Sequence, residues 1–563
     1  MDLLDSLESF LLTAIVALPA ATAAAMVVLT LALQIVGGPR LPNSVWRGLS
    51  LASTLLAFAA SVYLVIEVFD VEQLGLQVVE SISWSPALGA TLTFGIDGIS
   101  LCFLLSTTAL VPLALLSARE EESAADLRAR ILVTLTLESA LLGSLVAANL
   151  LVFIFFWAAT FVPILLWLGR WGGVGRARAA SRIWATESIG LAGLLFATFI
   201  LHEMSLSQLG APTLDFIAPL SENDPRTLLD VRLEVDEQWT IFFAFALALA
   251  TRLPIVPMHF WLPAAHAAAP AGLSILLATG FVQTAAMGWM RFALPLAPDA
   301  AEAAGPALSV LGIFALGYAS LIALVQKELK RLVAYSSVGY AGFSLFGMST
   351  LNVQGLTGAV LQLLTHGLAT AGLFLLTGFL AQRRGTTEVA AFGGLAKPMP
   401  VCAFFFGVMV LSLMGLPVLG GFVGDLFVLL GSLETRRTLS VFALLAMVVA
   451  ASYLLWVQRR IFLGPVDEPA NRGLIDLDRL ERSILLAITL PIIAIGVYPN
   501  PVLRRVEPAV LELLYQMERR SVVSDEAPER GAPGESDVPS RVARRGRGAA
   551  SATLDVARIW EGP

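Results

Sequence analysis

A few ionisable and polar side chains lie inside segments that are otherwise apolar, and their chemistry stands out in this sequence. A charged side chain is costly inside a bilayer, so one that occurs there usually belongs to an ion or proton pathway. Histidine changes charge near neutral pH and can therefore pass a proton on. The candidates for such a pathway in these segments are Glu138, Glu187, Arg252, His259, Gln283, His366 and Asp425. Lys330, in a predicted loop, joins them on other grounds given below.

Some of these residues also have a plainer interpretation. Arg252 could extend from a helix end to the membrane surface, although the apolar run continues beyond it. Glu187 follows Arg182 by five residues and could be solvated near the interface. A structural hydrogen bond for Glu138 fits the sequence about as well as a role in transport. A neutral, buried His366 is a similarly plain alternative.

The helix that contains Arg252 is expected to break directly after it. The next residues include three prolines: Pro254, Pro257 and Pro263. Proline removes a backbone donor and clashes with the preceding helical turn. In lipid the freed backbone groups need protein or water as partners, so a break at this depth should line a cavity. A second interruption, at residues 415–421, precedes Asp425.

The composition is that of a membrane protein. Of the 563 residues 57% are hydrophobic and 14% are charged, whereas soluble domains contain about 25% charged residues. The net charge of −7 gives no reason to expect a nucleic-acid partner. Cys102 and Cys402 lie in apolar runs and are expected to be small core residues. We find no motif for a metal, flavin, haem or iron–sulfur cofactor, so any electrons travel elsewhere.

Apolar runs long enough to cross a membrane recur along the chain and predict an all-α polytopic membrane protein of about 14 transmembrane helices. Residues 76–96 alternate irregularly and could form a short extracytoplasmic hairpin, and Asp97 is expected to cap the helix that follows. The predicted spans are 10–35, 46–69, 97–117, 129–147, 149–169, 183–203, 240–262, 270–294, 305–325, 332–350, 357–381, 400–432, 440–462 and 480–498.

Spans 4–8 and 9–13 are expected to be two copies of a five-helix repeat, each with its fourth helix broken. An odd number of spans per copy places the copies in inverted orientations, and paired broken helices point to ion sites at mid-membrane. The predicted divisions are 1–128 for the N-terminal spans 1–3, 129–294 for the first repeat, 295–462 for the second repeat, 463–515 for a loop and the last span, and 516–563 for a disordered polar tail.

Loop charges predict the orientation. Basic residues concentrate in the loops that follow odd-numbered spans, while the other loops hold only Arg226, Arg232, Arg291, Arg436 and Arg437. By the positive-inside rule the first set of loops is cytoplasmic, and both termini are then extracytoplasmic. The acidic N-terminus differs from the basic start of a signal peptide, so we expect the first span to be retained.

Several motifs resemble one family. Residues 252–270 are similar to the seventh span and following loop of the antiporter-like M subunit of respiratory complex I (NADH:quinone oxidoreductase). The same resemblance extends to residues 95–100, 155–163, 328–337, 365–374 and 412–425. It covers roughly residues 1–500. Span 5, the entry to span 3 and the absence of a long lateral helix favour the M type over its L and N relatives.

The resemblance implies a non-redox, proton-translocating subunit in the bacterial inner (cytoplasmic) membrane. Electron transfer in a distant arm would drive one proton channel, a chain of ionisable residues and water that joins two half-channels. The implied partners are protons, the lipid bilayer and other membrane subunits of a complex I-type assembly. Lys330 and His366 match the family pattern, and Glu138 matches an acid found in some members.

The chain departs from that pattern at central positions. The family has glutamate where this chain has Ala158, and lysine where it has Arg252 and Gln283. Arginine essentially never deprotonates, glutamine has no proton to give up at neutral pH, and alanine removes the partner carboxylate. Other departures are Ala264 for aspartate, Tyr340 for histidine and Asp425 for glutamate.

These departures suggest a divergent M-type subunit whose own proton transport is weakened, rerouted through Glu138, Glu187 and His366, or absent. Two other functions stay open on the sequence. One is a structural membrane subunit without pumping. The other is a cation/proton antiporter-like subunit of a related assembly, such as a membrane hydrogenase or an inorganic-carbon accumulator.

Overall fold

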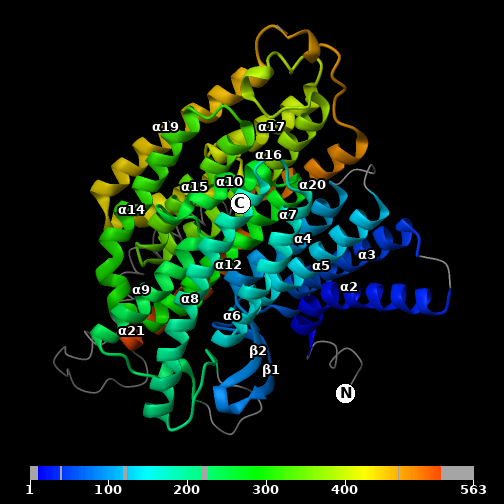
Figure 1. Ribbon diagram of the computed structural model, residues 1–563. Helices are drawn as coiled ribbons and strands as arrows, with labels where there is room; N and C mark the ends of the chain where they lie inside the picture. The colour runs from blue at the N-terminus through cyan, green and yellow to red at the C-terminus, as the bar shows by residue number, and fades with distance from the viewer. Residues whose placement is uncertain (1–9, 38–40, 118–122, 218–225, 467, 522–563) are drawn as a thin grey trace.

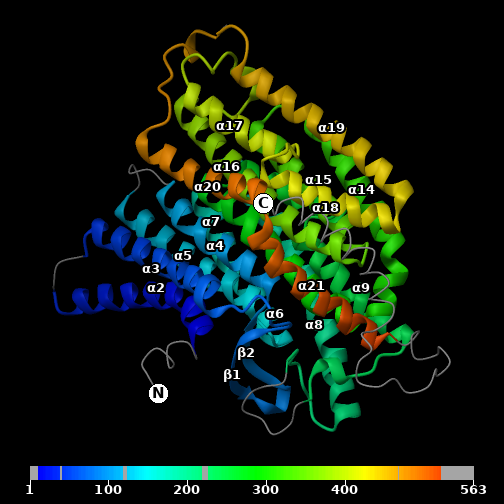
Figure 2. The same ribbon diagram turned by 180° about the vertical axis from the view of Figure 1, so that it is seen from behind.

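The structure is a computed structural model, and it describes residues 10–37, 41–117, 123–217, 226–466 and 468–521. Helices dominate this part of the chain. The helices α2 and α3 form one edge of the bundle and α14 and α19 the opposite edge, as both ribbon views show (Figures 1 and 2). The helices of the first half of the chain are α2 Leu11–Ile35, α3 Asn43–Tyr63, α4 Gly98–Leu116, α5 Ala124–Val146, α6 Leu150–Ala159, α7 Phe161–Trp171, α8 Arg176–Leu209, α9 Val235–Arg252, α10 Trp261–Ala268, α11 Ala271–Leu276, α12 Val282–Gly288 and α13 Leu294–Leu296.

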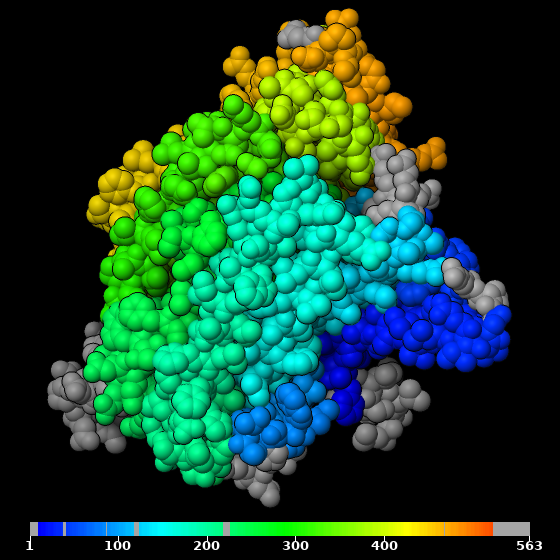
Figure 3. Space-filling view, in the orientation of Figure 1, coloured from blue at the N-terminus to red at the C-terminus, as the bar shows by residue number. Residues whose placement is uncertain are grey.

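The second half of the chain continues the bundle, and the space-filling view shows its surface joining that of the first half on one face (Figure 3). Its helices are α14 Pro298–Leu324, α15 Leu329–Met348, α16 Val353–Arg384, α17 Pro400–Leu413, α18 Gly420–Thr435, α19 Arg437–Phe462, α20 Arg479–Val497 and α21 Asn500–Arg520. Of the described helical segments, eleven are long and apolar enough to cross a membrane. The predicted spans 7, 10 and 12 coincide with α9, α15 and the pair α17–α18, which lie outside that set.

Both expected helix breaks are present. The helix α9 ends at Arg252, and a short 3₁₀ turn, Met258–Phe260, precedes α10. The indole Nε1 of Trp261 donates to the carbonyl of Thr251 at 2.7 Å, which satisfies one acceptor freed at the end of α9. In the second half, α17 ends at Leu413 and α18 begins at Gly420.

Further irregularities were not predicted, among them a π-helical end to the second predicted span, Leu64–Val68. The fifth predicted span is divided at Thr160 into α6 and α7. The eighth contains two π-helical segments, Leu277–Phe281 and Trp289–Ala293, on either side of α12. Such π-turns are rare and often occur at functional sites. They need no proline, so the sequence gives little warning of them.

The expected hairpin is present as strands β1 (Gln77–Ser85) and β2 (Ala90–Ile96), which pair antiparallel. It is tied to the start of α2, because the Glu80 carboxylate accepts hydrogen bonds from the backbone N–H groups of Leu12 and Thr13, at 2.6 and 2.8 Å. Burial raises the pKa of the Glu80 carboxyl, although these hydrogen bonds act to lower it.

Asp97 caps α4, as expected, and accepts a hydrogen bond from the backbone N–H of Ser100 at 2.7 Å. Cys102 and Cys402 are free thiols buried among apolar side chains, which confirms that they are core residues. The helix α16 lies between the two halves of the chain. It packs against α15, α17, α18 and α20 on one side and against α11 and the π-turn of the eighth span on the other.

The helix α21 was not predicted. Residues 516–520, expected to begin a disordered tail, form its last turn, and residues 522–563 lie outside the described part of the chain. Its buried residues recur at the spacing of one helical face: Val506, Val510, Leu513 and Met517. The helix crosses the bundle as a surface element, in orange and red in Figure 2, and packs on α4, α13 and α16.

Candidate functional site

The guanidinium group of Arg252 is fully buried between two aromatic rings. Its carbon lies 3.5 Å from the centre of the Trp157 ring and 4.1 Å from that of Phe281. A planar cation stacks well on aromatic faces, and the interaction is strongest where water is excluded. The burial of Arg252 excludes the alternative that its side chain extends to the membrane surface.

Every nitrogen of this guanidinium donates a hydrogen bond. Nε and Nη2 donate to one carboxylate oxygen of Glu187, at 3.2 and 2.8 Å. Nη1 donates to the hydroxyl of Thr284 at 3.2 Å. Nη2 also donates to the Thr160 hydroxyl at 3.0 Å and to the Trp157 carbonyl at 3.2 Å. The break between α6 and α7 therefore supplies two of the acceptors.

Glu187 reaches this site from α8. Its side chain is 2% exposed, so the alternative that it is solvated near the interface is wrong. The approach of α8 to α9 depends on two glycines. A Cβ atom at Gly190 would collide with the hydroxyl of Thr251, and one at Gly193 would lie 2.8 Å from the carbonyl of Ala244. Arg252 therefore has a buried carboxylate partner, Glu187.

Gln283 lies next to this pair, one residue before Thr284 on α12. Its Oε1 accepts a hydrogen bond from the Ser106 hydroxyl at 3.0 Å. Its Nε2 has no hydrogen-bond partner among the described residues. A Cβ atom built on Gly367 would lie 3.6 Å from this Nε2, so the amide faces α16 beside His366.

His366 lies between Gln283 and the second broken helix. Its Nε2 is 3.1 Å from the hydroxyl of Thr370, and its ring centre is 4.7 Å from that of Tyr340. The Tyr340 hydroxyl donates to the carbonyl of Leu413, the last residue of α17. In the sequence, Tyr340 appeared only as a departure from the family's histidine. In the structure it lies between His366 and the break that follows α17.

Asp425 folds back from α18 onto that break. A Cβ atom at Gly415, where φ is +69°, would lie 2.5 Å from its Oδ2. Both carboxylate oxygens are buried and have no hydrogen-bond partner in the described part of the chain. The same holds for Nδ1 of His366, Oε1 of Gln362 and the Ser412 hydroxyl. Buried polar atoms are nearly always hydrogen-bonded, so such a row is expected along a water-filled path.

The other predicted residues lie apart from this line. Lys330, at the start of α15, donates to the carbonyl of Ala269 at 2.8 Å. His259 lies in the turn before α10, with its ring centre 5.5 Å from that of Tyr318. Glu138 is buried on α5, and neither of its carboxylate oxygens has a partner among the described residues.

His266 lies in the motif at residues 252–270 but was not predicted as a site residue. It stacks on Phe374 with ring centres 4.2 Å apart, and both ring nitrogens lack a hydrogen-bond partner within the described residues. The aromatic cage and hydroxyls around Arg252 were also missed, because residues that meet across helices leave no periodic signal. Nowhere in the described chain do three His, Cys, Asp or Glu residues cluster as metal ligands would.

Comparisons with known proteins agree on one family. The family described as "NADH:quinone oxidoreductase/Mrp antiporter, TM" matches residues 147–452. NADH-quinone oxidoreductase subunit M of Rhodobacter capsulatus is 33% identical over 509 residues, which cover 90% of this chain and 96% of that protein. The protein of the same name from Rickettsia typhi is 32% identical, with 83% and 91% covered.

Solved structures give the same result. A chain of respiratory complex I from Thermus thermophilus superposes with a TM-score of 0.77 and 29% identity, covering 90% of this chain and 99% of that one. A chain of the Mrp complex from Dietzia sp. superposes with a TM-score of 0.74 at 20% identity, covering 92% and 100%, and this likeness shows the shared fold.

Proposed function

This chain belongs to the family of NADH:quinone oxidoreductase and Mrp antiporter membrane subunits, and we propose that it is the antiporter-like M subunit of a complex I-type NADH:quinone oxidoreductase. The resemblance drawn from its motifs is thereby confirmed at the level of the family. In this role the chain couples electron transfer elsewhere in the assembly to proton translocation and performs no redox chemistry itself. Its partners are other membrane subunits of that assembly, protons and the lipid bilayer.

The observation that supports a role in charge movement is the buried pair of Arg252 and Glu187 at the break after α9. A second broken helix places Asp425 at its own break, with His366 between the two. Broken helices that present charge at mid-membrane are a common device for binding and passing ions. The proposed pathway comprises Glu187, Arg252, Gln283, His366 and Asp425, with Lys330, His259 and Glu138 as side branches.

The proposed channel is weaker than that of the family pattern. Arg252 keeps its charge because a guanidinium does not deprotonate in proteins, and its cage leaves it little freedom to move. Gln283 can hydrogen-bond to water along the pathway through its free Nε2 but cannot take up a proton as a charge. The expectation that the carboxylate partner is lost with Ala158 needs correction, because Glu187 takes its place.

The proposed architecture has about 14 spans. It adds α9 with α10, α15, and α17 with α18 to the eleven apolar helical segments. The repeats are 129–294 and 295–462, inverted relative to each other. The broken helix in each supports this division. The proposed membrane is the bacterial inner membrane, with both termini outside the cytoplasm.

Purification of the tagged chain from its native membrane tests the assignment. The expected result is co-purification with quinone-site and iron–sulfur subunits, and loss of proton pumping coupled to NADH oxidation when the gene is deleted. Purification with cation-antiporter subunits, or pumping that survives the deletion unchanged, would contradict it. A third outcome would favour a purely structural subunit. In it, deletion lowers the amount of assembled complex, but the complex that still forms pumps the same number of protons per electron.

A further inference from the structure

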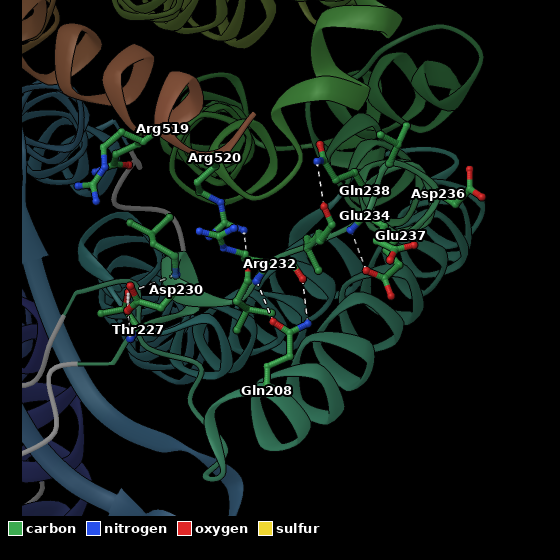
Figure 4. A pocket seen from close by; sticks show the side chains of 15 residues that line it. Gln208, Thr227, Asp230, Arg232, Glu234, Asp236, Glu237, Gln238, Arg519 and Arg520 are labelled. Atoms are coloured by element: carbon green, nitrogen blue, oxygen red, sulfur yellow. Dashed lines mark hydrogen bonds between the residues drawn. The ribbon is translucent and has the colours of Figure 1, made fainter. Parts of the chain in front are cut away.

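A wide cleft opens on the face that the loop charges predict to be extracytoplasmic. It has a volume of about 1190 Å³, and Figure 4 shows Gln208 of α8, Arg232 and the end of α21 around it. The cleft is polar, with acidic and basic side chains on its walls: Asp230, Arg232, Glu234, Asp236, Glu237, Arg519 and Arg520. A cleft with such walls is filled by solvent.

The end of α21 is fixed at this cleft. Arg520 donates to the carbonyls of Leu228 and Val231 at 3.0 and 2.8 Å. Burial lowers the pKa of Arg520 to about 10, so it stays protonated at neutral pH. The end of α21 therefore forms a wall of the cleft that is held in place by hydrogen bonds.

A smaller cavity of about 330 Å³ continues inward from the cleft. The two share the lining residues Thr227, Leu229 and Gln516, so they adjoin one another. The helix α21 covers the cavity with Ala509, Glu512 and Leu513. The opposite wall comes from α4 and the eighth predicted span: Asp97, Ile99, Met287, Met290 and Arg291.

The inner wall contains a buried ion pair. Nη2 of Arg291 donates to the Asp97 carboxylate at 2.8 Å, and Nη1 donates to the carbonyl of Ala147 at 2.9 Å. The Nε of Arg291 is buried and has no hydrogen-bond partner in the described structure. A buried guanidinium N–H needs an acceptor, and the cavity that Arg291 lines is large enough to hold water.

Two helices lead from this cavity to the proposed proton pathway. On α12, Met287 lines the cavity and lies one helical turn beyond Gln283. On α4, Ile99 lines the cavity, and two turns further along, Ser106 donates to Gln283. The side chain of Met287, 1% exposed, thus stands between the cavity and the Gln283 amide. Methionine is flexible and adapts its shape readily.

We propose that the cleft and the cavity form a water-filled vestibule that brings the extracytoplasmic phase to within one helical turn of Gln283, with Met287 as the side chain that closes it. The role of this vestibule as an outer proton access of the first repeat rests on the proposed function. Its accessibility to solvent does not. Rotation of Met287 would join water in the vestibule to the Gln283 amide, and a proton would then pass along that hydrogen-bonded chain.

Thiol labelling tests the vestibule without any turnover. In a complex whose Cys102 and Cys402 are replaced by alanine, Met290→Cys is exposed to a membrane-impermeant cationic methanethiosulfonate in right-side-out vesicles. Leu276→Cys, equally buried on the same span but away from the cavity, is the control. We expect labelling of Met290→Cys to be at least about tenfold faster, because a thiol packed in the core reacts only after local opening.

Two outcomes would overturn the vestibule. One is equal labelling of the two cysteines in right-side-out vesicles. The other is labelling of Met290→Cys from the cytoplasmic side only. Met287→Gln gives a second measurement, a faster passive proton leak than Met287→Leu in the same assembled complex. Rapid labelling of Met290→Cys that leaves the proton stoichiometry of the complex unchanged would keep the vestibule as a solvent-filled space and contradict its role as a proton access.

Discussion

The surroundings of Arg252 fit a guanidinium and would not fit an ammonium group equally well. Two aromatic faces and five hydrogen bonds match its planar shape and its forked donors. The sequence showed the change from lysine to arginine but not its partner. Glu187 lies 65 residues away on another helix, and only the close approach of α8 to α9 makes the pair.

Removing Glu187 tests this pairing at the scale of a single residue. Glu187→Ala leaves a buried cation unpaired, and we expect the unfolding free energy to fall by about 3–5 kcal/mol. Thermal unfolding of the purified assembly, followed at this subunit, measures the change. Glu203→Ala on the same helix is the control, because that side chain is 56% exposed. Equal stability of the two variants would show that the pair is not structural.

At the scale of helices, the two breaks with the densest proline and glycine signals were predicted, and the other irregularities were not. Pro254 and Pro257 directly follow the end of α9, and two closely spaced prolines disfavour a continuing helix because each lacks a backbone donor and clashes with the preceding turn. The division at Thr160 comes three residues before Pro163, whose ring and missing N–H disfavour helix through residue 159, so a local signal was present and was overlooked. The Thr160 hydroxyl then accepts a hydrogen bond from Arg252, which the sequence does not show. The helix α21 was overlooked because its apolar stripe runs through a largely polar sequence.

The contact between α8 and α9 gives the second prediction. Gly190→Ala places a methyl group against Thr251, so the helices must separate or the hydroxyl must rotate. We expect a loss of about 1–3 kcal/mol from overpacking, together with weaker proton pumping, because Glu187 is drawn away from Arg252. Gly169→Ala on α7 is the matched control, since its Cβ would meet no atom of the described residues within 4 Å. A variant at Gly190 as stable and active as the control would argue against the close approach.

For the molecule as a whole, the membrane class and the family followed from the sequence, because long apolar runs and several motifs point to them together. The surface that α21 forms could not be predicted from the sequence. This helix packs on α4, α13 and α16 and so joins segments that lie far apart in the chain. Near the start of α21, the Arg505 guanidinium donates to the carbonyl of Val65, and at its end Arg520 donates to the carbonyl of Leu228.

Detaching α21 gives the third prediction. Val510→Asp puts a charge on its buried face, and we expect amide hydrogen exchange across residues 500–520 to rise by at least about tenfold, because burying an unpaired charge costs several kcal/mol. The matched control is Leu511→Asp at the neighbouring position, where the side chain is 38% exposed. Equal protection in both variants would mean that the helix does not depend on its apolar face.

The central claim is that a fixed Arg252–Glu187 pair and a neutral Gln283 weaken the proton channel of this subunit. The most direct measurement is the number of protons moved per electron pair in proteoliposomes that contain the purified assembly. We predict that Ala158→Glu combined with Gln283→Lys raises this number above that of the unaltered protein. The claim is contradicted if the unaltered protein already matches the restored variant and Arg252→Ala or Asp425→Ala lowers the number.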